Sequence, residues 1–144
     1  MNIISHRGNL EGRSIETENH PSQIIKAMGE GFDVEVDVWV ENNKWFLGHD
    51  EPTYEIDFQF ISNYKNKLWV HAKNLNAVSE LQHKSVNWFW HQEDYVTLTS
   101  KGNIWCFPGY EVDGGIMVDY GQTTEVKVHG ICTNFPLKWI EEIE

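Results

Sequence analysis

The sequence predicts an α/β fold in a single domain, residues 1–144: a contracted TIM-type (β/α) barrel with shortened or missing helices. Three observations predict it. Strand patterns alternate with helix patterns along the chain, which is typical of a parallel sheet. A complete barrel takes about 200–250 residues, so this chain is too short for eight full units. Polar side chains follow strand after strand, as they do at the active end of such barrels. An open sheet is the competing architecture.

Eight short apolar, β-branched or aromatic runs are expected to form strands. They are Asn2–Ser5, Asp33–Val40, Trp45–Gly48, Leu68–His71, Asn87–Trp90, Asn103–Phe107, Gly115–Val118 and Gly130–Thr133. Only the polar residues 41–44 separate the second run from the third. These two runs therefore predict an antiparallel hairpin.

Three segments carry helix signals. Pro21 opens an amphipathic segment that Gly31 closes. Asn74 or Asn76 can cap a second segment in which apolar residues recur at helical spacing. Pro136 begins the last predicted helix. Between these helices and the strands, the chain shows no linker that would divide it into two domains.

Charge and cysteine content limit the partners. Twenty-two acidic and eleven basic side chains give a formal charge of −11, which disfavours nucleic acid and anionic membranes as partners. No apolar run approaches the length of a membrane span, and the first residues do not resemble a signal peptide. Cys106 and Cys132 lie in apolar stretches and are expected to be free, buried thiols. We therefore expect a cytoplasmic protein, and the sequence does not determine its oligomeric state.

Carboxylates and histidines gather at the predicted strand ends. Glu35 and Asp37 are two positions apart, so they share one face of a strand that is otherwise apolar. Two inward carboxylates need a counter-charge, which a divalent metal or a Lys or Arg side chain can supply. His71 ends one predicted strand, and each of His6, His49 and His91 directly follows another. The pattern predicts an active site at one end of the sheet.

Several motifs in this order resemble the glycerophosphodiester phosphodiesterases, within the superfamily of phosphatidylinositol phospholipase C-like phosphodiesterases. They are His6-Arg7-Gly8, Glu18-Asn19, Gly31 to Val38, Gly48-His49-Asp50, Val70 to Lys73 and Ile131 to Pro136. The match is good over about the first 50 residues and thinner beyond them. The resemblance implies a single phosphodiesterase-like barrel domain, a shortened and divergent member of that family.

The resemblance also implies an enzyme, a metal-dependent phosphoric diester hydrolase with a role in lipid metabolism. By this match His6 and His49 are the general acid and base, and Arg7 and Lys73 are the basic catalytic residues around the phosphate. The implied ligands of the metal, which is Mg²⁺, Ca²⁺ or Mn²⁺, are Glu35, Asp37 and His71. Residues expected to bind substrate are Glu18, His91 and Asn134. Elementary chemistry agrees, because cations neutralise a phosphodiester and histidine transfers protons near neutral pH.

The chain departs from the family pattern at three positions and in length. Thr17 replaces a proline, His71 replaces a carboxylate ligand, and Asn134 replaces an aspartate. The segment that covers glycerol in longer members is expected to be missing, which leaves room for a small-molecule or a glycan phosphodiester. Two alternatives stay open: a non-catalytic remnant that binds phosphate or sugar phosphate, and a phospholipase C-like lyase that forms a cyclic phosphate.

Overall fold

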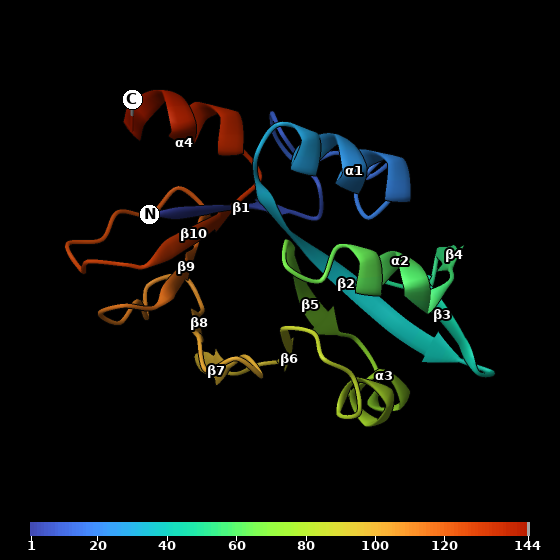
Figure 1. Cartoon of the computed structure of the whole chain (residues 1–144). Coiled ribbons are helices and arrows are strands. Elements are labelled where there is room, and N and C mark those ends of the chain that lie inside the picture. Colours follow the sequence, from blue (N-terminus) through green and yellow to red (C-terminus); the bar gives the residue numbers. More distant parts are fainter. Residues whose placement is uncertain (144) are drawn as a thin grey trace.

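The computed structural model describes residues 1–143, in which one curled sheet carries four short helices (Figure 1). The strands are β1 (Asn2–His6), β2 (Asp33–Glu41), β3 (Lys44–Leu47), β4 (Tyr54–Ile56), β5 (Leu68–Ala72), β6 (Trp88–Trp90), β7 (Val96–Leu98), β8 (Ile104–Cys106), β9 (Ile116–Val118) and β10 (Gly130–Thr133). The helices are α1 (Pro21–Gly29), α2 (Phe58–Asn63), α3 (Leu75–Leu81) and α4 (Pro136–Ile143). None of these helices is long and apolar enough to span a membrane.

The centre of the sheet is parallel, and both of its ends carry antiparallel strands. The parallel strands run in the order β6, β5, β2, β1, β10, β9 and β8. The long strand β2 pairs with β1 over its first half and with β3 over its second half, while β5 follows its other edge. Strand β4 adds to β3, and β7 adds to β8, each in antiparallel orientation. The parallel order brings the carboxyl ends of β1 and β5 level with residues 35–38 of β2.

The sheet curls into a half-barrel rather than a closed TIM-type barrel. No strand ladder joins β6 to β7 within residues 1–143; isolated hydrogen bonds link them instead. Thr97 donates its hydroxyl to the Trp90 carbonyl at 2.9 Å, and the Ser100 amide donates to the Trp88 carbonyl at 2.6 Å. The curl encloses a space at the carboxyl edge of the parallel strands.

The predicted contracted TIM-type barrel is therefore wrong in its architecture. That fold requires a helix between successive parallel strands, whereas the described chain from β6 to β10 contains no helix at all. The crossovers 107–115 and 119–129 are irregular loops, because a helical crossover needs a dozen or more residues. The three antiparallel pairs, β2/β3, β3/β4 and β7/β8, also make the sheet mixed. The fold is a mixed ten-stranded sheet with few helices.

The local predictions were more accurate than the architecture. The hairpin is confirmed: Glu41 pairs with Lys44, and Asn42 and Asn43 take φ values of 52° and 63°, as in a two-residue turn. Asn74 caps α3, since its side chain accepts a hydrogen bond from the Ala77 amide at 3.0 Å. The prolines begin α1 and α4 as expected. The sequence prediction did not include β4, β7 or α2.

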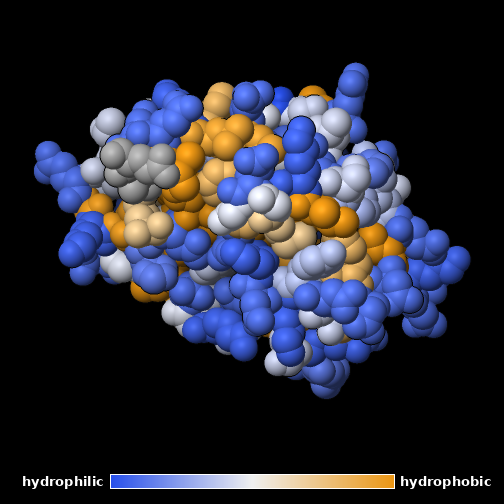
Figure 2. Space-filling view, turned by 45° about the horizontal axis from the view of Figure 1, so that its top comes forward, coloured by the Kyte–Doolittle hydropathy of each residue, from blue (hydrophilic) through white to orange (hydrophobic). Residues whose placement is uncertain are grey.

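Successive side chains of a strand point to opposite faces of the sheet, so the buried residues form two groups, one on each face. On β2, Val34, Val36 and Val38 face the main apolar core between the sheet and its helices, while Glu35 and Asp37 face the inside of the curl. A second apolar cluster lies on the inner face of the curled sheet: Ile4, Trp69, Phe89, Trp105, Ile116, Val118 and Cys132. The helices cover the outer face only in part, and Figure 2 shows a band of hydrophobic side chains between hydrophilic ones on the face turned forward there. Above the second cluster, the inside of the curl becomes polar.

Candidate active site

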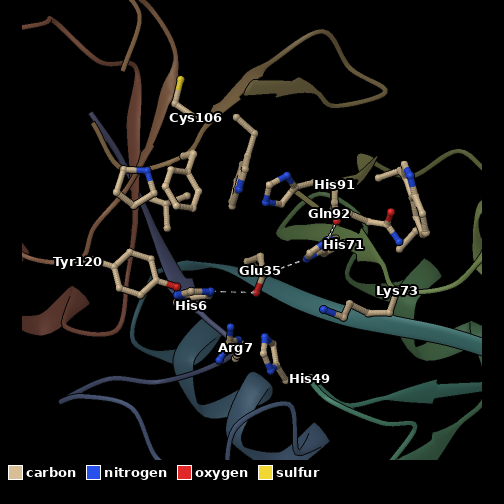
Figure 3. A pocket seen from close by; sticks show the side chains of 16 residues that line it. His6, Arg7, Glu35, His49, His71, Lys73, His91, Gln92, Cys106 and Tyr120 are labelled. Atoms are coloured by element: carbon tan, nitrogen blue, oxygen red, sulfur yellow. Dashed lines mark hydrogen bonds and ion pairs between the residues drawn. The ribbon is translucent and has the colours of Figure 1, made fainter. Parts of the chain in front are cut away.

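Most of the predicted site residues meet in one cavity. Its volume is about 580 Å³, and the predicted residues that line it are His6, Arg7, Glu35, His49, His71, Lys73 and His91. They come from the carboxyl ends of β1, β5 and β6 or the residues just after them, from the first half of β2, and from the segment after β3. Figure 3 shows their side chains directed toward the same space. The sequence pattern of polar strand ends thus identified a set of residues that the tertiary structure brings together.

The two carboxylates of β2 are almost completely buried. Glu35 and Asp37 are 2% and 0% exposed. Asn19 holds Asp37 through two hydrogen bonds, one from its amide to the carboxylate at 2.9 Å and one from the Asp37 backbone N–H at 3.0 Å. Burial and the neighbouring Asp37 raise the pKa of Glu35. For Asp37, burial opposes ionisation, but contact with His71 and the charge of Arg7 outweigh it and hold the pKa below its usual value.

His71 faces both carboxylates from the neighbouring strand β5, where it is in register with Asp37. Its Nδ1 lies 3.2 Å from Asp37 Oδ1 and 3.6 Å from Glu35 Oε2. Its Nε2 lies 3.1 Å from the backbone carbonyl of His91, and its ring stacks on Phe89 with centroids 4.8 Å apart. When Nε2–H is donated to that carbonyl and Nδ1 has lost its proton, the lone pair of Nδ1 is directed at the carboxylates.

These three side chains fit a divalent cation. One donor atom from each of Glu35, Asp37 and His71 lies within 4.8 Å of the other two. Glu35 Oε1 and Asp37 Oδ1 are buried and have no hydrogen-bond partner among the described residues, so both oxygens have free lone pairs. A histidine whose second nitrogen is held by a carbonyl is the usual arrangement around a bound metal. Mixed oxygen and imidazole donors suit transition metals such as Mn²⁺ better than Ca²⁺.

Arg7 lies between the cluster and a second acidic residue. Its Nε is 3.4 Å from Asp37 Oδ2, and its Nη1 is 3.3 Å from Glu18 Oε2. Burial opposes its charge, but Glu35, Asp37 and Glu18 outweigh burial and raise the pKa of Arg7. Arg7 and Asn19 both have positive φ, 62° and 63°, and are joined by a backbone hydrogen bond of 2.9 Å. Such backbone strain is costly away from glycine and is concentrated at functional sites.

His6 and His49 differ in their surroundings. His6 is buried, and burial together with Arg7 lowers its pKa to about 3, so its imidazole is neutral near pH 7. Its Nε2 lies 3.9 Å from Glu35 Oε1. The side chain of His49 is 29% exposed, and its Nδ1 lies 2.8 Å from Asp50 Oδ1. A neutral ring can accept a proton, and a ring steadied by a carboxylate is oriented to transfer one.

Gly48 places His49 by allowing the chain to turn tightly after β3. The Gly48 amide donates to the Asp37 carbonyl at 3.1 Å, and its carbonyl accepts from the Trp39 indole at 2.7 Å. A Cβ at position 48 would meet the Glu51 carbonyl at 2.0 Å. A side chain larger than hydrogen would therefore displace the loop that carries His49.

Two residues predicted to bind substrate lie away from the cavity surface. Glu18 is buried behind Arg7 and pairs with Arg7 and Arg13 at 3.3 Å each, so it orients cationic side chains. Asn134 accepts a hydrogen bond from Asn9 at 3.0 Å and borders a different hollow, near α4. His91, by contrast, lines the cavity, and its Nδ1 lies 3.8 Å from Asp94 Oδ2.

The cavity also has an apolar part that the sequence interpretation did not assign. Its lining includes Trp90, Trp105, Phe107, Pro108, Val118 and Tyr120, together with Ala72, Gln92 and Cys106. Several of these residues end β6, β8 and β9 or follow them closely, so the same rule that found the histidines would have found them if aromatic residues had been included.

The comparisons with known proteins do not identify a family. No family model, no curated protein and no solved structure matches this chain. Its function is therefore inferred from the chemistry of the cavity residues.

Proposed function

We propose that this protein is a metal-dependent phosphodiesterase that hydrolyses phosphoric diesters. One observation carries the proposal: two histidines, two cationic side chains and a carboxylate–histidine cluster line or adjoin a single cavity. Proton-transfer groups, phosphate-binding cations and metal donors are the three parts that this reaction requires. The resemblance of the His6, Glu35–Asp37 and His49 motifs to glycerophosphodiester phosphodiesterases supports the same class.

The cationic side chains suit a phosphodiester. Arg7 presents a planar guanidinium that can bind two phosphate oxygens, and Lys73 adds a point charge to the same cavity (Figure 3). A divalent cation held by Glu35, Asp37 and His71 would add further positive charge next to the same oxygens. Together these charges lower the repulsion between the anionic diester and an attacking oxygen.

The two histidines then account for the protons. His6 accepts a proton from water as the water oxygen forms a bond to phosphorus, and the negative charge of the bound diester and of Glu35, whose Oε1 is 3.9 Å away, must raise the low pKa of His6 for this step. The bond between phosphorus and the leaving oxygen breaks, and His49 in its protonated form donates a proton to that oxygen. Asp50 holds Nδ1–H of His49, which leaves Nε2–H for this step. The products are a phosphomonoester and an alcohol.

Hydrolysis of bis(p-nitrophenyl) phosphate with added Mn²⁺ tests the proposal. We expect His6→Ala and His49→Ala each to lower kcat by about 100-fold or more, the contribution of a general acid or base. The exposed His83, outside the cavity, provides the control His83→Ala, which should keep the wild-type rate. Circular dichroism checks that each variant is folded. A double variant of His6 and His49 with wild-type turnover would exclude this mechanism.

Product analysis separates the related activities. With glycerophosphocholine as substrate, phosphorus NMR distinguishes a phosphomonoester from the cyclic phosphate that a lyase would release. Binding of inorganic phosphate without any turnover would instead indicate a non-catalytic remnant.

The same chemistry supports a small-molecule or glycan phosphodiester as substrate and a cytoplasmic location. The formal charge of −11 disfavours nucleic acid. Cys106 and Cys132, both within the described chain, are free and buried, as is usual in a reducing compartment.

A further inference from the structure

The cavity is larger than a phosphate group requires, and one of its sides is apolar. Beyond the polar cluster, its wall includes Trp105, Phe107, Val118 and Tyr120. Tyr120 lies next to His6 in Figure 3, on the opposite side of the cavity from Lys73. Its ring is edge-on to the His6 ring, with centroids 6.2 Å apart. A volume of about 580 Å³ leaves room for a substituent of the phosphate against this aromatic side.

The aromatic wall continues out of the cavity onto the surface. Phe107 is 49% exposed, and its ring centroid lies 6.2 Å from that of Tyr110. Tyr110 in turn stacks on Tyr95, with centroids 4.3 Å apart and planes inclined by 13°. The Phe107 amide donates to the Tyr95 carbonyl at 2.9 Å, which holds the two loops together. We call Phe107, Tyr110 and Tyr95 the aromatic track; exposed apolar groups that gather in this way mark binding surfaces.

The loops that carry the aromatic track are acidic. Segments 91–95 and 107–113 contain Glu93, Asp94, Glu111 and Asp113 and no Lys or Arg. Gln122 and the Gly109 amide hold the Glu111 carboxylate, at 2.9 Å and 3.1 Å. Such a surface repels polyanions and anionic bilayers. It also suits an acyl chain poorly, because covering carboxylates and tyrosine hydroxyls with hydrocarbon leaves them without hydrogen bonds.

A neutral sugar chain matches all these features. The C–H groups on the flat face of a gluco-configured pyranose are weakly electropositive and stack on the electron-rich face of an aromatic ring. Sugar hydroxyls donate hydrogen bonds to carboxylates at the edge of such a stack. A compact cationic headgroup such as choline could make all its cation–π contacts with the aromatic rings inside the cavity. It would not reach the parallel Tyr95–Tyr110 pair outside.

We propose that the aromatic track binds a neutral glycan attached through the phosphodiester that the cavity cleaves. The inference rests on the proposed phosphodiesterase function and specifies its substrate: one ester oxygen carries a chain of gluco-configured sugars. The phosphate lies among Arg7, Lys73 and the two histidines, and the sugars extend over Phe107 toward Tyr110 and Tyr95. The glycan alcohol or the phosphorylated glycan is released according to which P–O bond breaks.

The test compares four p-nitrophenyl phosphodiesters whose second alcohol is cellobiose, methanol, dodecanol or choline. We expect the wild-type kcat/KM to be at least about tenfold higher for the cellobiosyl diester than for the methyl diester. Tyr95→Ala combined with Tyr110→Ala should lower kcat/KM about tenfold for the cellobiosyl diester and less than about twofold for the methyl diester. Tyr95 is 64% exposed and Tyr110 46%, and neither belongs to the apolar core, so the fold should persist. Leu98→Ala is the matched control, since Leu98 on β7 is 64% exposed and outside the track.

Several outcomes would overturn the glycan proposal. They are a preference for the dodecyl or choline diester, or an equal loss in the double variant for all four diesters. If no diester is hydrolysed, the proposed phosphodiesterase function fails, and quenching of tryptophan fluorescence then measures binding of the cellobiosyl diester directly. About tenfold weaker binding to the double variant than to the wild type would still support the sugar site, and equal binding would refute it.

Discussion

Divalent cation binding to this protein should depend steeply on pH, because a cation must replace a proton on His71. Burial alone would lower the pKa of His71, but contacts with Asp37 and Glu35 outweigh burial and raise it to about 9 in the metal-free protein. A metal binds the neutral imidazole, so only the fraction that has lost the Nδ1 proton is competent. At pH 7 that fraction is about one in a hundred, and the apparent affinity is reduced by the same factor.

The direction of this pH dependence follows from the raised pKa of His71. The protonated form dominates below about pH 9, so the affinity should rise about tenfold for each pH unit between pH 6.5 and 8.5. Isothermal titration calorimetry with Mn²⁺ measures this directly. Repeating the titration in buffers with different ionisation enthalpies counts the protons released, which should be about one per ion.

His71→Gln provides the comparison. An amide at position 71 keeps an oxygen donor and has no proton to lose near neutral pH, so most of the pH dependence in this range should disappear. His91→Gln, which changes a cavity residue outside the Glu35–Asp37–His71 cluster, should keep the wild-type slope. A wild-type affinity that is constant from pH 6.5 to 8.5 would refute the reasoning, since His71 would then not exchange a proton for the cation.

Two further predictions concern the same cluster. Removal of the metal with EDTA should lower the melting temperature by roughly 10 °C if the ion is present at about 100 times its Kd, because an ion held by Glu35, Asp37 and His71 binds and stabilises only the folded state. An unchanged melting curve in differential scanning calorimetry would mean that no ion binds there and that Arg7 and protonated His71 neutralise both carboxylates. Activity and binding titrations should rank Mn²⁺ above Ca²⁺, and His71→Glu should shift the ranking toward Ca²⁺ or Mg²⁺. Identical rankings in the two proteins would show that His71 is not a ligand.

Local patterns in the sequence determined much of what lies around the site. Alternation along residues 33–40 assigned Glu35 and Asp37 to one strand face, and the structure has both side chains inside the curl. Hairpin, proline and capping signals were also reliable. Each of these features depends on residues that are only a few positions apart. Their relative geometry is fixed by the two-residue period of a strand or the 3.6-residue period of a helix. The sequence could therefore predict which strand residues are polar and face the site and which are apolar and face the core.

Only the tertiary structure decided how the strands are connected and which side chains converge. The loops 107–115 and 119–129 form no helices, so the sheet is a curled half-barrel instead of the predicted barrel. Curl and register brought His71 opposite Asp37, placed Glu18 behind Arg7 and directed Asn134 to another hollow. Contacts of this kind join residues far apart in the chain, and their geometry depends on the curvature of the whole sheet. The curvature of the sheet cannot be predicted from the residues of any one strand. The sequence by itself therefore determined which side chains are candidates for the site, and the tertiary structure determined how they are arranged.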